Sequence, residues 1–268
     1  MAVDQAERAE LIRVAHELAD AARPETLKHF RSNVTSENKA GEAAFDPVTI
    51  ADRNAEAAMR KHLAVVRPDD GILGEEFGHA EGSTGLTWVL DPIDGTRGYI
   101  SGTPTWGVLI AVSDASGPIY GIIDQPYIGE RFSGGWRTAI SAGPLGETPL
   151  KTRSGTRLSE ATILTTFPEI GSEEERAGFH DVAGRARLTR YGMDCYGYAL
   201  LAAGQVDLVI EATLNPYDIH APIAVVEAAG GVVTDWRGGP GHDSSRVVAA
   251  ADPDIHAEAL EILSRYDP

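Results

Sequence analysis

Residues 88–99 read Trp-Val-Leu-Asp-Pro-Ile-Asp-Gly-Thr-Arg-Gly-Tyr, an apolar strand pattern that stops at two carboxylates. Asp91 and Asp94 stand three residues apart at the end of this run, where they can hold a hard cation such as Mg²⁺. Gly95 and Thr96 follow, and the backbone N–H groups of such small residues can face an anion. The stretch therefore predicts a metal-assisted phosphate site at a strand end.

The composition limits the kind of protein that carries this site. The chain has 268 residues, 43% of them hydrophobic, which is enough for a large core in one domain or two smaller halves. Its apolar runs are much shorter than the roughly 20 residues of a membrane span, and the N-terminus shows no signal-peptide pattern. The single cysteine, Cys195, fits a reducing compartment. We therefore expect a cytoplasmic protein without membrane association.

The charge of the chain bears on its partners. A formal net charge of −17 argues against a nucleic-acid-binding surface, which would need clustered Lys and Arg. The same charge repels an anionic substrate such as a phosphate ester. Bound cations would reverse the sign of the potential at the site, so the charge is consistent with a metal-dependent mechanism on a small phosphorylated substrate.

The first half of the chain combines helices with short strands. Apolar residues at helical spacing predict an N-terminal helix that ends before Pro24, and a second helix from Asp52 to about Leu63. The polar stretch 36–45 is typical of a mobile loop. Short β-like runs separated by turns follow, which favours hairpins, a largely antiparallel sheet and an α/β layered half. The strands are expected at 71–73, 87–90, 106–112 and 118–124, with a ribbon near 131–139.

The second half repeats this mixture without repeating the sequence. Strands are expected at 161–166, 187–191, 206–211 and 232–235, and helices at 196–203, 219–229 and 253–266. We place the boundary between the halves near residues 146–150. The N-terminal half, 1–148, then carries most of the metal ligands, and the C-terminal half, 149–268, carries Asp218 and the residues that recognise the substrate.

Several acidic residues stand where a strand pattern ends or a helix pattern begins. Two or three Mg²⁺ ions with octahedral oxygen coordination need carboxylates from separate segments. Two ions about 4 Å apart would neutralise a phosphate, lower the pKa of an attacking water and stabilise the departing alkoxide. Each acid taken alone is more simply explained as a turn residue or a solvated surface acid. The candidates are Asp46, Glu75, Glu76, Asp91, Asp94 and Asp218.

The order of these segments resembles a known family. Asp46-Pro-Val-Thr-Ile-Ala-Asp52, Gly74-Glu-Glu76, Asp91-Pro-Ile-Asp-Gly-Thr96 and Tyr217-Asp218 together are similar to the inositol monophosphatase-like family of Mg²⁺-dependent, lithium-sensitive phosphatases. The resemblance covers nearly the whole chain and implies an alternating α-β-α-β-α sandwich and a homodimer. Residues 190–207 and 95–102 look like the histidinol-phosphate phosphatase branch of this family.

The resemblance also implies a metal-ligand set. Glu75 and Asp91 would bind a first Mg²⁺ together with the backbone carbonyl of Ile93. Asp91 would bridge to a second metal, which Asp94 and Asp218 would hold. These residues come from three separate segments of the chain, so the implied cluster depends on the fold.

Roles at the phosphate follow from the same resemblance. The N–H groups of Gly95 and Thr96 would hold phosphate oxygens. Asp46 and Thr96 would orient and help deprotonate the attacking water, with Glu75 assisting through the metal shell. The family pattern does not extend clearly to Lys39, whose role stays open because a longer segment separates it from Asp46 than in many relatives.

Recognition of the alcohol group distinguishes members of the family. Histidinol phosphate carries an ammonium and an imidazole, so its pocket should offer negative charge, whereas an inositol needs partners for hydroxyl groups. Asp194 and Glu211 fall where the family contacts the alcohol, and a carboxylate at 194 favours a cationic substrate or else caps the following helix. Arg190 either contributes to this site or pairs with one of these acids. His220, two positions after Asp218, points into the site or packs within its helix.

These observations favour a Mg²⁺-dependent phosphomonoesterase that acts on L-histidinol phosphate in histidine biosynthesis. Inositol 1-phosphate, or a related sugar or nucleotide 3′-phosphate, is the alternative substrate within the same fold. A metal-binding regulatory protein with little turnover is a third alternative. A binding module has no need for a water-activating pair beside metal ligands, so the full acid set favours the enzyme.

Overall fold

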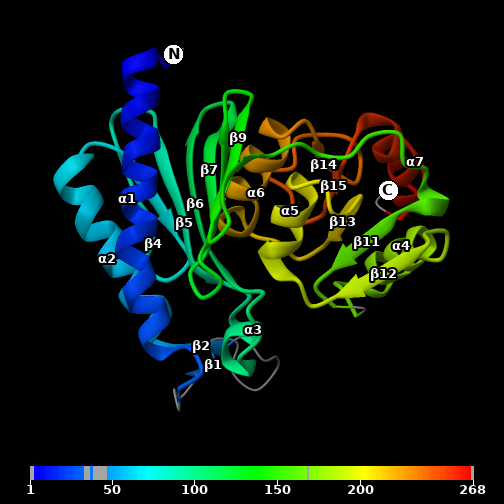
Figure 1. The fold of residues 1–268 in the computed structure, drawn as a ribbon, viewed down its shortest axis with the longest axis horizontal. Coiled ribbons are helices and arrows are strands. Elements are labelled where there is room, and N and C mark those ends of the chain that lie inside the picture. Colours follow the sequence, from blue (N-terminus) through cyan, green and yellow to red (C-terminus); the bar gives the residue numbers. More distant parts are fainter. Residues whose placement is uncertain (1–2, 33–36, 39–46, 168, 267–268) are drawn as a thin grey trace.

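Layers of helices and sheets alternate through the molecule (Figure 1). The fold is that of a computed structural model, which describes residues 3–32, 37–38, 47–167 and 169–266. Within them, paired helices pack on both outer sides and between two sheets, which confirms the expected α-β-α-β-α sandwich. The helices are α1 (Gln5–His29), α2 (Ile50–Val66), α3 (Thr96–Ser101), α4 (Glu173–Ala183), α5 (Asp194–Ala202), α6 (Pro216–Ala228) and α7 (Pro253–Leu263), with a 3₁₀ turn at Leu158–Glu160.

The first sheet has eight strands in the order β10-β9-β8-β7-β6-β5-β3-β4. Only β3 and β5 pair in parallel among the described strands of this sheet, which confirms the largely antiparallel arrangement that the turns predict. The strands are β3 (Gly71–Gly74), β4 (Gly78–Ala80), β5 (Thr87–Asp94), β6 (Gly107–Asp114), β7 (Gly117–Gln125), β8 (Glu130–Gly135), β9 (Thr138–Gly143) and β10 (Gly146–Pro149). A separate short pair joins β1 (Glu37–Asn38) to β2 (Pro47–Val48).

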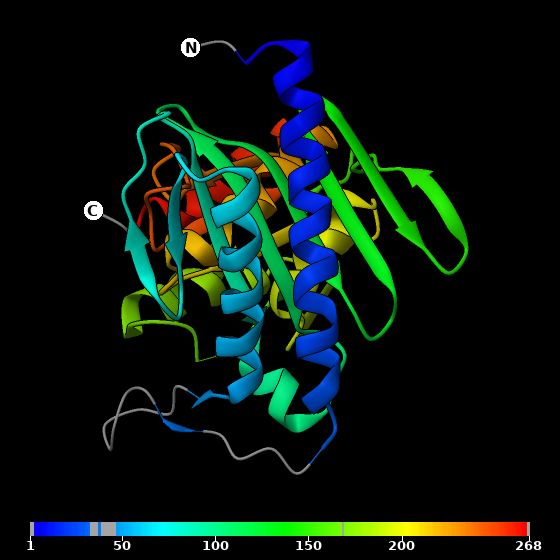
Figure 2. The same ribbon diagram turned by 90° about the vertical axis from the view of Figure 1, so that its left-hand side faces the viewer.

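α1 and α2 lie side by side on the outer face of this sheet (Figure 2). The prediction that the first helix ends before Pro24 is wrong, because α1 continues to His29. Pro24 has no N–H, so the carbonyl of Asp20 loses its helical hydrogen bond. Both residues are exposed, and water can therefore solvate this carbonyl. The last turn is held by tertiary contacts, since buried Thr26 accepts a hydrogen bond from the Tyr99 hydroxyl at its carbonyl.

The second sheet is mixed and has the order β12-β11-β13-β15-β14. β11 pairs in parallel with β12 and β13, whereas β15 runs antiparallel to β13 and β14. The strands are β11 (Thr162–Thr165), β12 (Leu188–Tyr191), β13 (Leu208–Glu211), β14 (Val232–Asp235) and β15 (Val247–Ala250). Sequence reasoning missed β15 and also α4, whose sequence is mostly polar and buries few large apolar side chains, among them Phe179 and Val182.

α5 and α6 lie between the two sheets, which explains their composition. α6 buries a continuous run of side chains, Ile219–Val226, because it contacts a sheet on each side.

No helix in the described part of the chain has the length and apolar character that a membrane crossing requires. The first sheet ends at Pro149 with β10, and the division into halves at 148/149 stays a prediction.

Candidate metal and phosphate site

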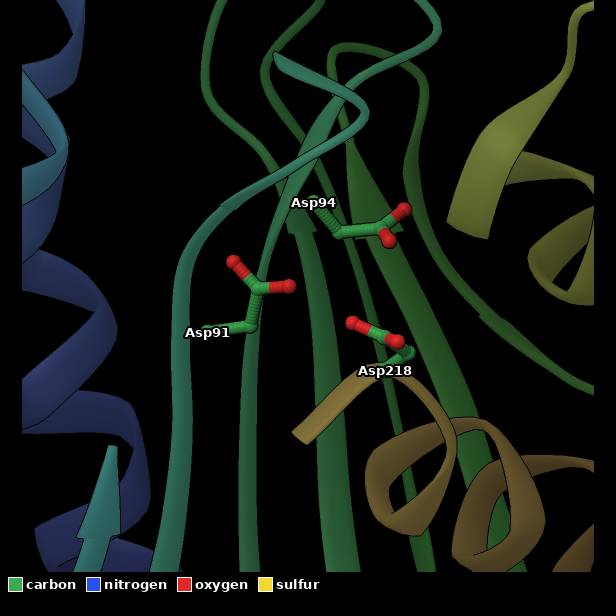
Figure 3. A group of neighbouring side chains, drawn as sticks. All are labelled: Asp91, Asp94 and Asp218. Carbon is green, nitrogen blue, oxygen red and sulfur yellow. The ribbon is translucent and has the colours of Figure 1, made fainter. Parts of the chain in front are cut away.

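Asp91 and Asp94 lie at the end of β5, where the regular pairing of this strand with β6 breaks. The pairing register shifts between the two residues, and the Ile93 N–H donates a 3.0 Å hydrogen bond to the Asp91 carboxylate. Asp218 comes from the first turn of α6. One carboxylate oxygen from each of the three acids lies within 4.8 Å of the other two, and Figure 3 shows the three side chains turned toward one another. The fold thus brings Asp218 of α6 next to two acids from a distant segment of the chain.

The electrostatics of this cluster favour the binding of a cation. Burial raises the pKa of the Asp91 carboxyl well above its ordinary value, and the neighbouring carboxylates of Glu75, Asp94 and Asp218 raise it further. Burial, Asp194 and Asp218 raise the pKa of Asp94 in the same way. Several acids that destabilise one another's charged forms are stabilised when a divalent ion neutralises them. Their oxygen donors suit Mg²⁺, so the residues present fit the metal that the sequence predicts.

Glu75 follows β3 and lines the same pocket as the three aspartates. Its segment is fixed by Glu56, a fully buried acid of α2 that accepts hydrogen bonds from the N–H groups of Glu76 (2.7 Å) and Phe77 (3.2 Å). Arg60 pairs with Glu56 at 2.7 Å and neutralises it. Glu76, the remaining sequence candidate in this segment, does not line the pocket. The α2 helix therefore supports the loop that carries Glu75.

Thr96 begins α3 directly after Gly95, whose φ of 80° lies in the left-handed region that glycine favours. The Thr96 hydroxyl lies 3.1 Å from the Ile93 carbonyl and 3.5 Å from an Asp52 carboxylate oxygen. The other Asp52 oxygen accepts hydrogen bonds from Thr49 as part of the cap of α2. The structure therefore places Asp52 beside Thr96, whereas Asp46 lies outside the described residues.

The start of α5 is tied to the cluster. The Cys195 N–H donates a 2.7 Å hydrogen bond to Asp94, and the preceding residue, Asp194, adopts a positive φ of 46°. The Asp194 carboxylate accepts a 3.1 Å hydrogen bond from Thr105. It also packs against Gly95, where an added Cβ would lie 2.7 Å from the Asp194 carboxyl carbon. Asp194 is thus held over the start of α3 by close packing, and no side-chain cap of α5 forms.

Glu211 ends β13 and lies in the same pocket. One carboxylate oxygen accepts hydrogen bonds from the N–H (2.7 Å) and hydroxyl (2.9 Å) of Thr166, and the other accepts one from Thr165 (3.2 Å). Burial nevertheless raises the pKa of Glu211 to about 8, with a smaller contribution from the Asp194 charge. Near neutral pH this side chain is a carboxylic acid that a bound cation would ionise.

The pocket has a volume of about 300 Å³ and contains most of the predicted site residues. Arg190 does not line it and is exposed on the edge strand β12. His220 is buried elsewhere, with Nδ1 2.8 Å from the Ser113 hydroxyl and Nε2 3.2 Å from the His242 carbonyl. Lys39 lies outside the described part of the chain. The predicted site residues that line the pocket are Glu75, Asp91, Ile93, Asp94, Gly95, Thr96, Asp194, Glu211 and Asp218.

Several neighbours of the site were not found from the sequence, among them Asp52, Arg97 and Phe167. Asp52 stands in a capping pattern, so its sequence position suggests only a structural role. Arg97 and Phe167 also line the pocket, and the guanidinium carbon of Arg97 lies 4.8 Å from the centre of the Phe167 ring. Nothing in their local patterns indicates this contact, because the two residues are distant in the chain.

The alternating layers and the carboxylate cluster at the end of β5 define a metal-dependent phosphatase that acts on phosphoric monoesters. The chain belongs to the inositol monophosphatase family, whose model matches residues 7–267.

Individual relatives carry different names within this family. The chain is 44% identical to the chloroplastic bifunctional phosphatase IMPL2 of Arabidopsis thaliana over 93% of its own length and 74% of that protein. It is 34% identical to a histidinol-phosphatase of Streptomyces coelicolor, covering 95% of this chain and 97% of the relative. An inositol monophosphatase structure from Zymomonas mobilis superposes with a TM-score of 0.83 at 39% identity, covering 94% and 97% of the two chains.

Proposed function

We propose that the protein hydrolyses L-histidinol phosphate to L-histidinol and inorganic phosphate with Mg²⁺, as a step of histidine biosynthesis. The observation that carries this proposal is the pair of acids, Asp194 and Glu211, that line the pocket beside the metal cluster. A substrate whose alcohol carries an ammonium and an imidazole matches two carboxyl groups better than a neutral polyol does. The histidinol-phosphatase relative at 34% identity supports the same substrate.

The metal ligands in this proposal are Glu75, Asp91, Asp94 and Asp218, with the Ile93 carbonyl. Two or three Mg²⁺ ions, when bound, supply the positive charge that attracts the phosphate and lower the pKa of a water molecule. The N–H groups of Gly95 and Thr96 bind phosphate oxygens. Ions held by the acid cluster would thereby draw an anionic substrate to a protein whose net charge is −17.

Thr96 and Asp52 orient the attacking water in this proposal. The Thr96 hydroxyl accepts the proton of the water while it passes its own proton to Asp52, which lies 3.5 Å away. The water oxygen forms the new bond to phosphorus, and the alcohol oxygen leaves with the electrons of the broken P–O bond. The alcohol oxygen takes up a proton from solvent, and Asp52 returns its proton to solvent. The role of Asp46 beside Thr96 stays a prediction. Comparing the activity of Asp46→Asn with that of Asp52→Asn distinguishes the two acids.

Inositol 1-phosphate is the second candidate substrate, and one observation favours it. Because the pKa of Glu211 is about 8, this side chain is protonated near neutral pH and can donate a hydrogen bond to a hydroxyl group. A neutral acid is a poorer partner for an ammonium than a carboxylate. The similarity to an inositol monophosphatase of known structure agrees with this alternative.

The decisive measurement is kcat/KM for L-histidinol phosphate and for inositol 1-phosphate, each with Mg²⁺ and with a chelator. We expect Mg²⁺-dependent turnover and at least a tenfold preference for L-histidinol phosphate. Asp194→Asn, which keeps the shape and the tolerance of positive φ, should reduce the activity on histidinol phosphate more than on inositol 1-phosphate. A preference for inositol 1-phosphate would contradict the proposed substrate, and no metal-dependent release from either would contradict the phosphatase assignment.

Assembly and location complete the proposal. We propose that the protein is a homodimer in the cytoplasm, as the family resemblance and the reduced single cysteine suggest. Light scattering coupled to size-exclusion chromatography measures the mass of the assembly, and a monomer would contradict the first part. Fractionation of the source cells with a tagged chain tests the second.

A further inference from the structure

Arg97 and Phe167 meet at the pocket from opposite halves of the fold. Arg97 belongs to α3, which follows β5 of the first sheet, and Phe167 follows β11 of the second sheet (Figure 1). The Arg97 guanidinium carbon lies 4.8 Å from the centre of the Phe167 ring, and both residues line the pocket that holds Asp194 and Glu211. The pocket wall therefore contains an aromatic face beside carboxyl groups, and a planar cation already lies on that face.

The surroundings of the Arg97 guanidinium would also suit a planar nitrogen heterocycle. The positive charge of Arg97 lowers the pKa of the Asp194 carboxyl, against the larger effect of burial, so this charge is felt at the acid as well as at the ring. A planar cation between an aromatic face and a carboxylate is a favourable arrangement, which holds equally for guanidinium and imidazolium groups. Arg97 is exposed, so its side chain has room to turn toward solvent and uncover the Phe167 ring.

We propose that the Phe167 ring is the stacking surface for a planar nitrogen heterocycle on the substrate's alcohol group, and that Arg97 competes with this heterocycle for the ring. Both are then specificity-determining residues, because an alcohol without an aromatic ring gains nothing from displacing Arg97. This inference rests on the proposed function, since it names the residues that recognise the alcohol half of that substrate. Asp194 adds the negative charge that favours the protonated ring.

A binding experiment tests this independently of turnover. Isothermal titration calorimetry on the full chain with Mg²⁺ measures the Kd of L-histidinol and of L-leucinol, which keeps the amino alcohol but replaces the imidazole with an alkyl group. Phe167→Leu should raise the Kd of L-histidinol about fivefold, the loss expected for one cation–aromatic contact, and leave that of L-leucinol unchanged. Phe167→Tyr keeps a ring and should bind both as the wild type does.

Arg97→Gln supplies the complementary test. If Arg97 competes for the ring, its removal should lower the Kd of L-histidinol and change that of L-leucinol less. A higher Kd of L-histidinol in Arg97→Gln would overturn the competition, and an equal change for both alcohols in Phe167→Leu would overturn the stacking. Circular dichroism of each variant checks that the fold is retained, and if Phe167→Leu is unfolded, Phe167→Met takes its place with the same expected fivefold loss.

The outcomes for this inference and for the proposed function are separable. If the wild type hydrolyses inositol 1-phosphate better than L-histidinol phosphate, the proposed substrate is wrong. The role of Phe167 is then still tested by the Kd values. The wild type should bind L-histidinol more tightly than L-leucinol, and Phe167→Leu should lose this difference. Equal affinity of the wild type for the two alcohols would overturn it.

Discussion

The backbone N–H of Cys195 donates a 2.7 Å hydrogen bond to the carboxylate of Asp94, across 101 positions of the chain. This bond joins the first residues of α5, which packs against the second sheet, to the end of β5 in the first sheet. It holds the Asp94 carboxylate in place beside the other acids of the cluster. The proposed metal site is therefore connected to both sheets of the fold.

Asp94→Asn should reduce kcat at least about 100-fold, because an amide supplies less negative charge to a metal than a carboxylate does. The amide oxygen can still accept the Cys195 N–H, so the fold should remain. Phosphate release at increasing Mg²⁺ measures the effect, with thermal melts as a check of folding. Asp69→Asn, an exposed acid outside the pocket, is the matched control. Activity near that of the wild type in Asp94→Asn would contradict its assignment as a ligand.

Asp52→Asn and Thr96→Ala should each lower kcat about 100-fold if the two residues move one proton together. The double variant should then be little worse than either single variant, because residues that act as a unit are not additive. Thr96→Ser keeps the hydroxyl and should retain most activity. Asp46→Asn is the direct comparison: a large loss there with an active Asp52→Asn would favour the sequence-based assignment over the one drawn from the structure.

Glu211 should make the metal-free protein less stable as the pH rises. Its folded pKa of about 8 exceeds the ordinary value of 4.5, so its stabilising effect is complete below pH 4.5 and is lost as the pH rises through 8. Between pH 6 and pH 8, the free energy of unfolding of the wild type should fall about 2 kcal/mol more than that of Glu211→Gln. Urea unfolding with a chelator present measures both. Parallel pH profiles would contradict the raised pKa.

Glu56→Ala should destabilise the protein by about 3 kcal/mol, because it leaves Arg60 without its buried partner and two N–H groups of the Glu75 loop without an acceptor. Mg²⁺ affinity should fall as well, since that loop carries Glu75, which we propose as a metal ligand. Glu261→Ala is the matched control, because Glu261 forms an exposed ion pair with Arg265 at the same spacing along the chain. Its loss should cost less than about 1 kcal/mol. Urea unfolding and Mg²⁺ titration compare the two, and equal losses would show that Glu56 has no supporting role.

Local patterns predicted the main elements well where an element buries one continuous stripe or run. The apolar spacing of α1 and the continuous apolar runs of β5 and β6 fall in this class, since the sequence itself shows which side chains are buried. The patterns failed where distant contacts overrule local preference. α1 passes Pro24 because buried contacts hold its last turn, and α4 forms from a mostly polar segment because it packs against α7.

The sequence by itself determined the class of the protein, because the acids that end β5, follow β3 and start α6 stand in recognisable local patterns. Only the tertiary structure decided which side chains meet. It placed Asp52 beside Thr96, Arg97 on Phe167 and Arg190 away from the pocket on an edge strand. The physical reason is that a local pattern reports which face of an element is buried, whereas contacts across the pocket depend on how two sheets pack around α5 and α6.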